Sequence, residues 1–386
     1  MLNKIKNIAV FTSIRSEYGL LSPLIRAIDK DLDFSLDLLV GGAHLIKEYG
    51  ETINQIIADG FKISETFDFL DINNHDDFST SSLSNLQEQI GKYFYFNRPD
   101  LIFVLGDRYE LIPVASSALL YNIPIAHISG GETTEGAIDN QIRHALTKMA
   151  HLHFPATDIY KKNILKMGEE EWRICTSGEP GLDEILNMDF IEKDDLFEDL
   201  GLSLNKKTIC CTFHPQTIDN LIDGDFVESL LREISCYNEF QVLITASNFD
   251  NGGREINGVI EKFASENSGV VFVQSLGQKR YYSLLKYADI MIGNSSSGLV
   301  EAQSFNLPVI NVGNRQKGRL SNVNVINCGI DINEILSTIK FGVSDEFKSV
   351  FHNKPNIYGD GTACVKIINF LKALPSNNLL VKKDIF

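Results

Sequence analysis

The stretch LIFVLGDRYELIPVASSALLYNIPIAHISGG (101–131) decides the fold class of this chain. It begins with an apolar, β-branched run that ends at Asp107, continues with an amphipathic segment over 109–121, and closes with a second apolar run over 123–131. Parallel strands that are buried on both faces have such continuous apolar sequences, and helices connect them. The stretch therefore predicts a strand–helix–strand unit of a parallel sheet.

The same alternation extends over the rest of the chain. Further amphipathic segments at 18–30 and 137–150 are typical of helices, and an acidic stretch over 189–206 separates two series of strands. The other apolar runs that suit buried strands lie at 8–13, 34–42, 208–213, 240–247, 270–275, 288–294, 307–313 and 323–328. The sequence therefore predicts an α/β protein with two Rossmann-like, doubly wound domains.

The length of 386 residues agrees with two domains. We expect an N-terminal Rossmann-like domain over 1–185 and a C-terminal one over 186–360. The last piece, 361–386, contains an amphipathic segment at 361–373 that is expected to form a helix. This helix suits either domain, and packing back on the N-terminal domain is one of the two alternatives.

Composition and charge exclude several classes of function. The chain has 35 Lys+Arg against 51 Asp+Glu, so its formal charge of -16 disfavours binding to nucleic acid or to an anionic membrane. No apolar run reaches the length of a membrane span, and Thr12 and Arg15 interrupt the first one, so we expect neither a membrane anchor nor a secretory signal. The six cysteines show no CxxC spacing and predict reduced core residues of a cytoplasmic protein.

Polar residues follow the predicted strands of the N-terminal domain, at the edge where parallel sheets bind ligands. Arg15 follows the first strand, and Asp107 and Glu132 follow two consecutive strands, so two carboxylates are expected to face one crevice. The helix at 137–150 adds Asp139 and Arg143 one turn apart. A structural ion pair between these last two residues is the alternative interpretation.

The motif GNSSSG (293–298) joins a predicted strand to a helix in the C-terminal domain. Its backbone N–H groups and hydroxyls, next to a helix N-terminus, suit a phosphate group. A plain helix cap by Ser295 or Ser296 is an equally good interpretation. Glu301 follows, where its carboxylate is expected either to accept from ribose hydroxyls or to be solvated on the helix.

Other strand ends of this domain carry further candidate phosphate contacts. His214 in CTFHPQT and Asn248 each follow a strand, and NVGNRQKGR (311–319) places Arg315 in a basic loop of an acidic protein. A guanidinium matches phosphate oxygens well. A structural histidine and a solvated basic loop are the competing interpretations.

Several cofactor and metal signatures are missing. The chain has no GxxxxGKS, GxSxG or HExxH, and no GxGxxG follows the first strand, so we expect no NAD and no P-loop nucleotide. His151 and His153 point the same way on a strand but lack an acidic or cysteine partner nearby, which disfavours a metal site. The sequence thus predicts no metal and no cofactor.

Taken together, the motifs resemble the hydrolysing UDP-N-acetylglucosamine 2-epimerases that bacteria use for sialic-acid-type sugars. The matching stretches span residues 8–320 in the order of that family: FTSIRSEYGLL, LGDRYE, GGETTEGAIDNQIRHALTKMAHLHF, FHPQT, GNSSSGLVE and GNRQKGR. The resemblance implies a GT-B-like architecture, with the nucleotide on the second domain and the sugar in a cleft between the domains. It also implies a UDP-sugar substrate and a homodimer or homotetramer.

The resemblance implies a role for each candidate residue. Asp107 and Glu132 would be the catalytic carboxylates, and Asp139 and Arg143 would line the sugar pocket. The implied UDP contacts are Arg15, His214, Asn248, Ser295, Ser296, Glu301 and Arg315.

The implied reaction converts UDP-N-acetylglucosamine and water to N-acetylmannosamine and UDP. Ser129 stands where sialic-acid members of the family often have His, and a small side chain there would leave room in the sugar pocket. UDP-N,N'-diacetylbacillosamine, for legionaminic acid synthesis, is therefore the alternative substrate. The motifs are also compatible with a non-hydrolysing epimerase, a GT-B glycosyltransferase or a UDP-sugar-binding protein.

Overall fold

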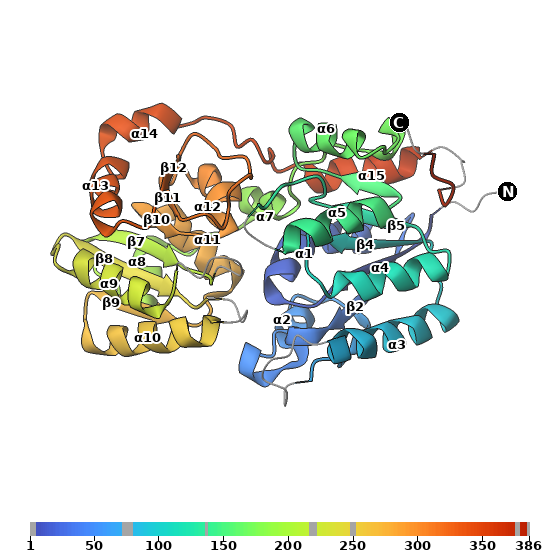
Figure 1. Cartoon of the computed structure of the whole chain (residues 1–386), viewed down its shortest axis with the longest axis horizontal. Helices are drawn as coiled ribbons and strands as arrows, with labels where there is room; N and C mark the ends of the chain where they lie inside the picture. Colours follow the sequence, from blue (N-terminus) through green and yellow to red (C-terminus); the bar gives the residue numbers. More distant parts are fainter. Residues whose placement is uncertain are drawn as a thin grey trace. The chain divides into compact units, whose positions relative to one another are not determined.

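The computed structural model describes residues 5–71, 80–135, 138–215, 222–247, 252–374 and 379–383. Within them, two six-stranded parallel sheets with their helices form two compact units, so the predicted α/β class with two doubly wound domains is confirmed (Figure 1). Unit 1 comprises Met1–Glu132, Asp139–Leu186 and Tyr358–Phe386, and unit 2 comprises Thr133–Ile138 and Asn187–Ile357.

Unit 1 is built around a sheet with the strand order β3-β2-β1-β4-β5-β6. The strand order reverses between β1 and β4, which are hydrogen-bonded neighbours, and ligands bind at such a point in doubly wound folds. The elements in chain order are β1 (Asn7–Thr12), α1 (Arg15–Lys30), β2 (Ser35–Gly41), α2 (Ile53–Ala58), β3 (Ile63–Phe67), α3 (Thr80–Phe96), β4 (Leu101–Leu105), α4 (Leu111–Leu120), β5 (Ile125–Ile128), α5 (Asp139–Met149), β6 (Leu152–Phe154), α6 (Asp158–Lys166), α7 (Gly181–Asn187) and α15 (Ala363–Ala373).

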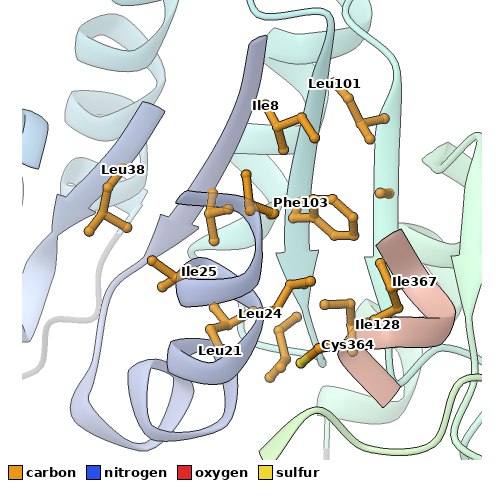
Figure 2. Close-up of a cluster of buried hydrophobic side chains, with 14 of the residues drawn as sticks. Ile8, Leu21, Leu24, Ile25, Leu38, Leu101, Phe103, Ile128, Cys364 and Ile367 are labelled. Carbon is orange, nitrogen blue, oxygen red and sulfur yellow. The ribbon is translucent and has the colours of Figure 1, made fainter. Parts of the chain in front are cut away.

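The core of unit 1 includes a helix from the far end of the chain. Figure 2 shows Leu21, Leu24 and Ile25 of α1 in the same buried cluster as Cys364 and Ile367 of α15. The carboxylate of Asp183 accepts hydrogen bonds from the first two backbone N–H groups of α15, at 2.9 and 2.7 Å. The C-terminal amphipathic helix therefore belongs to unit 1, because its apolar face completes that unit's core.

Two strands of unit 1 are not evident from hydrophobic runs. β3 has the sequence ISETF and is mostly exposed, and β6 contains only three residues. Both lie at the edges of the sheet. β3 buries little side-chain surface, whereas β6 is buried but too short to give a recognisable apolar run.

Unit 2 repeats the topology, with the strand order β12-β11-β10-β7-β8-β9 and a reversal between β7 and β10. Its apolar strands and helices form one buried cluster that includes Ile209, Val242 and Ile292. The elements in chain order are α8 (Lys193–Leu200), β7 (Lys207–Thr212), α9 (Gly224–Ser235), β8 (Phe240–Thr245), α10 (Gly253–Glu266), β9 (Val270–Val273), α11 (Gly277–Tyr287), β10 (Ile290–Gly293), α12 (Ser296–Val300), β11 (Val309–Val312), β12 (Val325–Cys328), α13 (Ile332–Gly342) and α14 (Asp345–Phe351).

All six cysteines are free thiols, but they are not all core residues. Cys236 is exposed at the end of α9 and Cys175 is only half-buried, so the prediction of six core cysteines is wrong for these two. Among the described helices, none combines the length and apolar character that crossing a bilayer requires.

Candidate functional site

A buried guanidinium lies between two carboxylates at the carboxyl end of the unit 1 sheet. Asp107 follows β4, Glu132 follows β5, and Arg143 projects from α5. Arg143 Nη2 donates to Asp107 Oδ2, and its Nη1 lies 3.4 Å from Glu132 Oε2. Arg143 and Glu132 are buried, whereas the Asp107 side chain is 21% exposed. The structure therefore brings together the two predicted catalytic carboxylates and one of the two predicted sugar contacts.

The electrostatics of this cluster differ from those of an ordinary surface ion pair. A buried charge needs a partner, because its transfer from water costs several kcal/mol. Arg143 contacts both carboxylates, so one buried guanidinium has two acidic partners. Asp107 is the member that solvent reaches, which leaves it accessible to a ligand.

The turn that carries Glu132 is shaped by packing. Gly131 has a φ of +78°, and a Cβ on it would lie 2.6 Å from the backbone oxygen of Tyr160. A Cβ on Gly130 would lie 2.9 Å from the ring of His127. Both positions therefore require glycine for steric reasons, and these glycines direct the chain after β5 so that Glu132 reaches Arg143.

Ser129, in the same turn, is hydrogen-bonded to another part of unit 1. Its side chain is buried, and its hydroxyl donates to the carboxylate of Glu179, with the two oxygens at 2.8 and 2.9 Å. That a small residue at this position leaves room in a pocket stays a prediction. Ser129 ties β5 to the segment before α7.

Glu17, which the sequence interpretation missed, supports the turn after β1. Its Oε2 accepts from both the backbone N–H and the hydroxyl of Ser13, each at 2.9 Å. Burial, together with the nearby charge of Glu110, raises the pKa of the Glu17 carboxyl to about 7. Arg15 lies in this turn at the first position of α1 and is exposed. Glu17 is the third residue of α1, the position from which a capping-box glutamate reaches back to the chain before the helix.

In unit 2, Asn294 organises the strand ends at the point where the strand order reverses. It follows β10, and its amide accepts from the backbone N–H of His214 and donates to the backbone oxygen of His214, both at 2.7 Å. Arg315 Nη1 and Gln316 Nε2 donate to the backbone oxygen of Asn294 at 3.2 and 2.9 Å. The predicted phosphate contacts His214 and Arg315 are thus held at one place by a residue outside the predicted set.

The GNSSSG turn has features of a phosphate site and of a plain helix cap. Gly293 has a φ of +144°, and a Cβ on it would lie 1.8 Å from the backbone oxygen of Thr212, so only glycine fits. Ser295 caps α12 by accepting from the N–H of Ser297 at 3.4 Å, and Ser296 is the first residue of α12. Because α12 has only five residues, its dipole would contribute little to binding a phosphate group. Binding there would depend on the local N–H and hydroxyl groups as donors.

Glu301 is buried at the end of α12 and is not a solvated helix carboxylate. It accepts hydrogen bonds from the hydroxyl of Ser297 and from the hydroxyl of Tyr282, the latter at 3.0 Å. Tyr281 donates to Ser297 at 2.6 Å. Burial raises the pKa of the Glu301 carboxyl. Hydroxyl groups on α11 and α12 therefore form a hydrogen-bond network around the Glu301 carboxyl. No sequence motif identifies Tyr281 and Tyr282 as members of this network.

The remaining predicted residues are placed as follows. Asp139 is half-buried at the start of α5, one turn before Arg143, whose ion pairs include Asp107 and Glu132. Asn248 lies outside the described residues. The expectation that His151 and His153 lack an acidic partner is wrong for His153, because its Nε2 lies 3.1 Å from Glu169 Oε2, and burial lowers the pKa of His153. Among the described residues, no three His, Cys, Asp or Glu side chains are grouped so that they could hold a metal ion.

Known proteins resemble this chain over nearly its whole length. The GDP/UDP-N,N'-diacetylbacillosamine 2-epimerase (hydrolyzing) of Campylobacter jejuni is 38% identical over 89% of each chain. The UDP-N,N'-diacetylbacillosamine 2-epimerase (hydrolyzing) of Legionella pneumophila is 33% identical over 98% of this chain and 99% of the relative.

The fold also matches a solved structure. UDP-GlcNAc 2-epimerase from Neisseria meningitidis, bound to UDP-GlcNAc, superposes with a TM-score of 0.82 at 18% identity, over 95% of this chain and 100% of the other. Residues 26–372 match the family model described as UDP-N-acetylglucosamine 2-epimerase. The ordered motifs, the two doubly wound units and these matches agree, and the chain belongs to the UDP-N-acetylglucosamine 2-epimerase family.

Proposed function

We propose that the protein is a hydrolysing UDP-sugar 2-epimerase, which converts a UDP-linked 2-acetamido sugar and water to UDP and the free 2-epimeric sugar. The observation that carries the proposal is the cluster of Asp107, Arg143 and Glu132, which supplies two carboxylates at the carboxyl end of the unit 1 sheet. Membership of the family supports it, as do the two relatives named as hydrolysing 2-epimerases.

The chemistry of the sugar explains why two carboxylates are needed. The proton on C2 is not acidic, because the acetamido nitrogen offers no resonance for a carbanion. Elimination therefore comes first: one carboxylate removes the C2 proton while UDP leaves C1 with the bonding electron pair, which gives a 2-acetamidoglycal. An acid then protonates C2 from the opposite face and water adds at C1, which yields the free epimer.

We assign the two proton transfers to Asp107 and Glu132. A general acid or base of this kind contributes about 10²–10⁴-fold to the rate. Arg143 contacts both carboxylates and so fixes their separation. Asp139, one turn before Arg143 on α5, is the proposed second contact to the sugar.

The nucleotide contacts are proposed for the strand ends of unit 2 and for Arg15. The leaving diphosphate gains charge as the C1–O bond breaks, and positioned donors stabilise that charge. Arg315 and His214, both hydrogen-bonded to Asn294, are the donors that we propose, and Ser295 and Ser296, which follow Asn294 in the chain, are further proposed contacts. Glu301, which is bonded to the hydroxyls of Ser297 and Tyr282, is the proposed acceptor for the ribose hydroxyls. Asn248 remains a proposed nucleotide contact.

Two sugars are candidates for the substrate. UDP-N-acetylglucosamine is the candidate that the motifs suggest. The second candidate, UDP-N,N'-diacetylbacillosamine, is favoured by the names of the two relatives, at 38% and 33% identity. Because Ser129 is engaged with Glu179, its small size does not decide between them. We expect the diacetamido sugar to have the higher kcat/KM.

In this proposal, the free 2-epimeric sugar is a precursor for the synthesis of sialic- or legionaminic-acid-type sugars. We also propose a cytoplasmic location, because six free thiols suit a reducing compartment.

The test is to incubate the protein with each nucleotide sugar, without any acceptor, and to quantify the free nucleotide and the free sugar. Equal amounts of UDP and of the free 2-epimer are expected. A product that still carries UDP would indicate a non-hydrolysing epimerase, and no turnover without an acceptor would indicate a glycosyltransferase or a binding protein. A GDP-linked sugar is included, since one relative is named for both nucleotides.

A further inference from the structure

The turn between β1 and α1 is held by a side chain from inside the helix. Glu17 Oε2 accepts from the backbone N–H and from the hydroxyl of Ser13, each at 2.9 Å. Ile14, the residue before α1, has an apolar side chain that cannot accept a hydrogen bond, so Glu17 takes the part of the missing cap. The conformation of the residues that lead into Arg15 therefore depends on Glu17.

The two oxygens of the Glu17 carboxyl group have unequal surroundings. Oε2 has both Ser13 donors, whereas Oε1 is buried and has no hydrogen-bond partner among the described residues. A carboxylate that is removed from water needs donors for its charge, and a neutral group is less costly to bury. A proton on Oε1 removes the charge and leaves both bonds from Ser13 in place. The geometry therefore favours the neutral form of Glu17.

A second buried acid lies near Glu17. Glu110, just before α4, is buried, and Arg108 donates to both of its carboxylate oxygens at 2.9 to 3.2 Å. Burial and then the charge of Glu110 raise the pKa of the Glu17 carboxyl to about 7, although Arg108 and the bonds from Ser13 oppose this. Since β1 and β4 are neighbours, the two acids lie where the strand order reverses, and Asp107 follows β4 at the same place.

We propose that Glu17 is a positioning residue for the leaving diphosphate: it fixes the turn that presents Arg15, and it does so in its neutral form. This inference rests on the proposed function, in which Arg15 contacts the diphosphate. An ionised Glu17 adds a buried negative charge behind the turn, and that charge repels an anionic ligand. Affinity for UDP therefore falls as Glu17 loses its proton.

The first test measures the affinity for UDP by titration calorimetry from about pH 5.5 to about pH 8.5, on either side of the pKa of Glu17. The wild type is compared with Glu17→Gln, whose amide oxygen still accepts from Ser13 but which cannot ionise. UDP itself ionises in this range, and the ratio of the two dissociation constants removes that contribution.

The ratio is expected to be close to one at the acidic end of the range. At the alkaline end, the wild type is expected to bind about tenfold more weakly than Glu17→Gln, which corresponds to a rise of about one unit in the pKa of Glu17 when UDP binds. A residue that only stabilises the fold would give a ratio that does not change with pH.

Two further variants separate the hold on the turn from the charge. Glu17→Leu removes both bonds to Ser13 and is expected to weaken UDP binding by about tenfold or more at every pH. Ser13→Ala is the milder variant: it keeps the bond from the backbone N–H, and it is expected to weaken binding about threefold. Melting temperatures check that both variants are folded.

Glu110→Gln tests the source of the pH dependence. It removes the neighbouring charge that raises the pKa of Glu17, so the loss of UDP affinity is expected to begin at a lower pH than in the wild type. The matched control is Asp29→Asn, which neutralises an exposed acid at the other end of α1 and is expected to bind UDP as the wild type does at each pH.

Two results would overturn the inference and leave the proposed function standing. One is a wild type that binds UDP with the same affinity as Glu17→Gln at every pH. The other is undiminished affinity for UDP in both Glu17→Leu and Ser13→Ala. A wild type that binds no UDP at any pH would instead remove the proposed nucleotide site, and the role of Glu17 with it.

Discussion

At the scale of single residues, Asp107 and Glu132 share one buried arginine, Arg143. Asp107→Asn and Glu132→Gln are each expected to lower kcat by about 10²–10⁴-fold, because each removes one proton-transferring group. Affinity for UDP should change little, because the proposed nucleotide contacts, apart from Arg15, lie in unit 2. Steady-state kinetics and titration calorimetry with UDP check this, and loss of UDP binding in either variant would contradict the division of roles.

Glu17 gives a prediction about stability and pH. Its pKa is about 7 in the folded protein against 4.5 for an ordinary glutamate, so between these values the unfolded chain loses a proton that the folded chain keeps. Stability therefore falls as the pH rises through this window, by up to about 3 kcal/mol. Glu17→Gln cannot ionise, yet its amide oxygen still accepts from Ser13.

The free energy of unfolding of Glu17→Gln should match that of the wild type near about pH 4 and exceed it near about pH 8, by up to about 3 kcal/mol. Urea denaturation at several pH values measures the difference. Glu261→Gln, at an exposed site on α10, is the control and should show no such divergence. A gap that stays constant with pH would show that Glu17 does not titrate in this range.

At the scale of elements, the loops after β7 and β10 depend on Asn294. Asn294→Ala removes two hydrogen bonds to the His214 backbone, each worth about 0.5–1.5 kcal/mol of stability. Affinity for UDP is expected to fall about tenfold or more, because His214 loses its fixed position. Asn322→Ala is the control: Asn322 also bonds backbone in unit 2, to Leu299 and Ile357, so stability should fall but UDP affinity should not. Equal UDP affinity in both variants would remove Asn294 from the proposed site.

Central strands and the carboxylates that follow them are predictable from the sequence, because a strand buried on both faces is continuously apolar and a parallel sheet gathers its strand ends. The contact between Asn294 and His214 is not predictable, since it joins residues 80 positions apart through backbone atoms. The placement of α15 needed the tertiary structure, because its apolar face suits either domain. The edge strand β3 is too exposed, and the buried strand β6 too short, to leave a recognisable apolar run.

At the scale of the whole molecule, Lys382, far along the chain, is bound to residues at the end of α5 and after α6 in unit 1. Lys382 Nζ donates to the backbone oxygens of Lys148 and Ala150 at 2.8 and 2.7 Å and pairs with Glu169. Glu169 is buried, and its hydrogen bonds to His153 and to lysines lower its pKa to about 2 although burial opposes this. Lys382→Ala is expected to destabilise unit 1 by about 1.5–3 kcal/mol, because it removes a charge-assisted hydrogen bond to buried Glu169, which keeps Lys148 as a partner.

Chemical denaturation measures this loss, and Lys383→Ala, at an exposed neighbouring position, is the control that should stay within about 0.5 kcal/mol of the wild type. An equal effect of the two substitutions would mean that Lys382 contributes only as part of a flexible tail.

The central claim concerns the reaction, and the fate of the hydrogen on C2 tests it most directly. The protein is incubated in D₂O with UDP-N,N'-diacetylbacillosamine and, separately, with UDP-N-acetylglucosamine, and the products are followed by proton NMR. Elimination and hydration through Asp107 and Glu132 predict a free sugar of inverted configuration at C2 that carries one solvent deuterium there, released in step with UDP. A product that keeps its original hydrogen on C2, or that remains attached to UDP, would contradict the account.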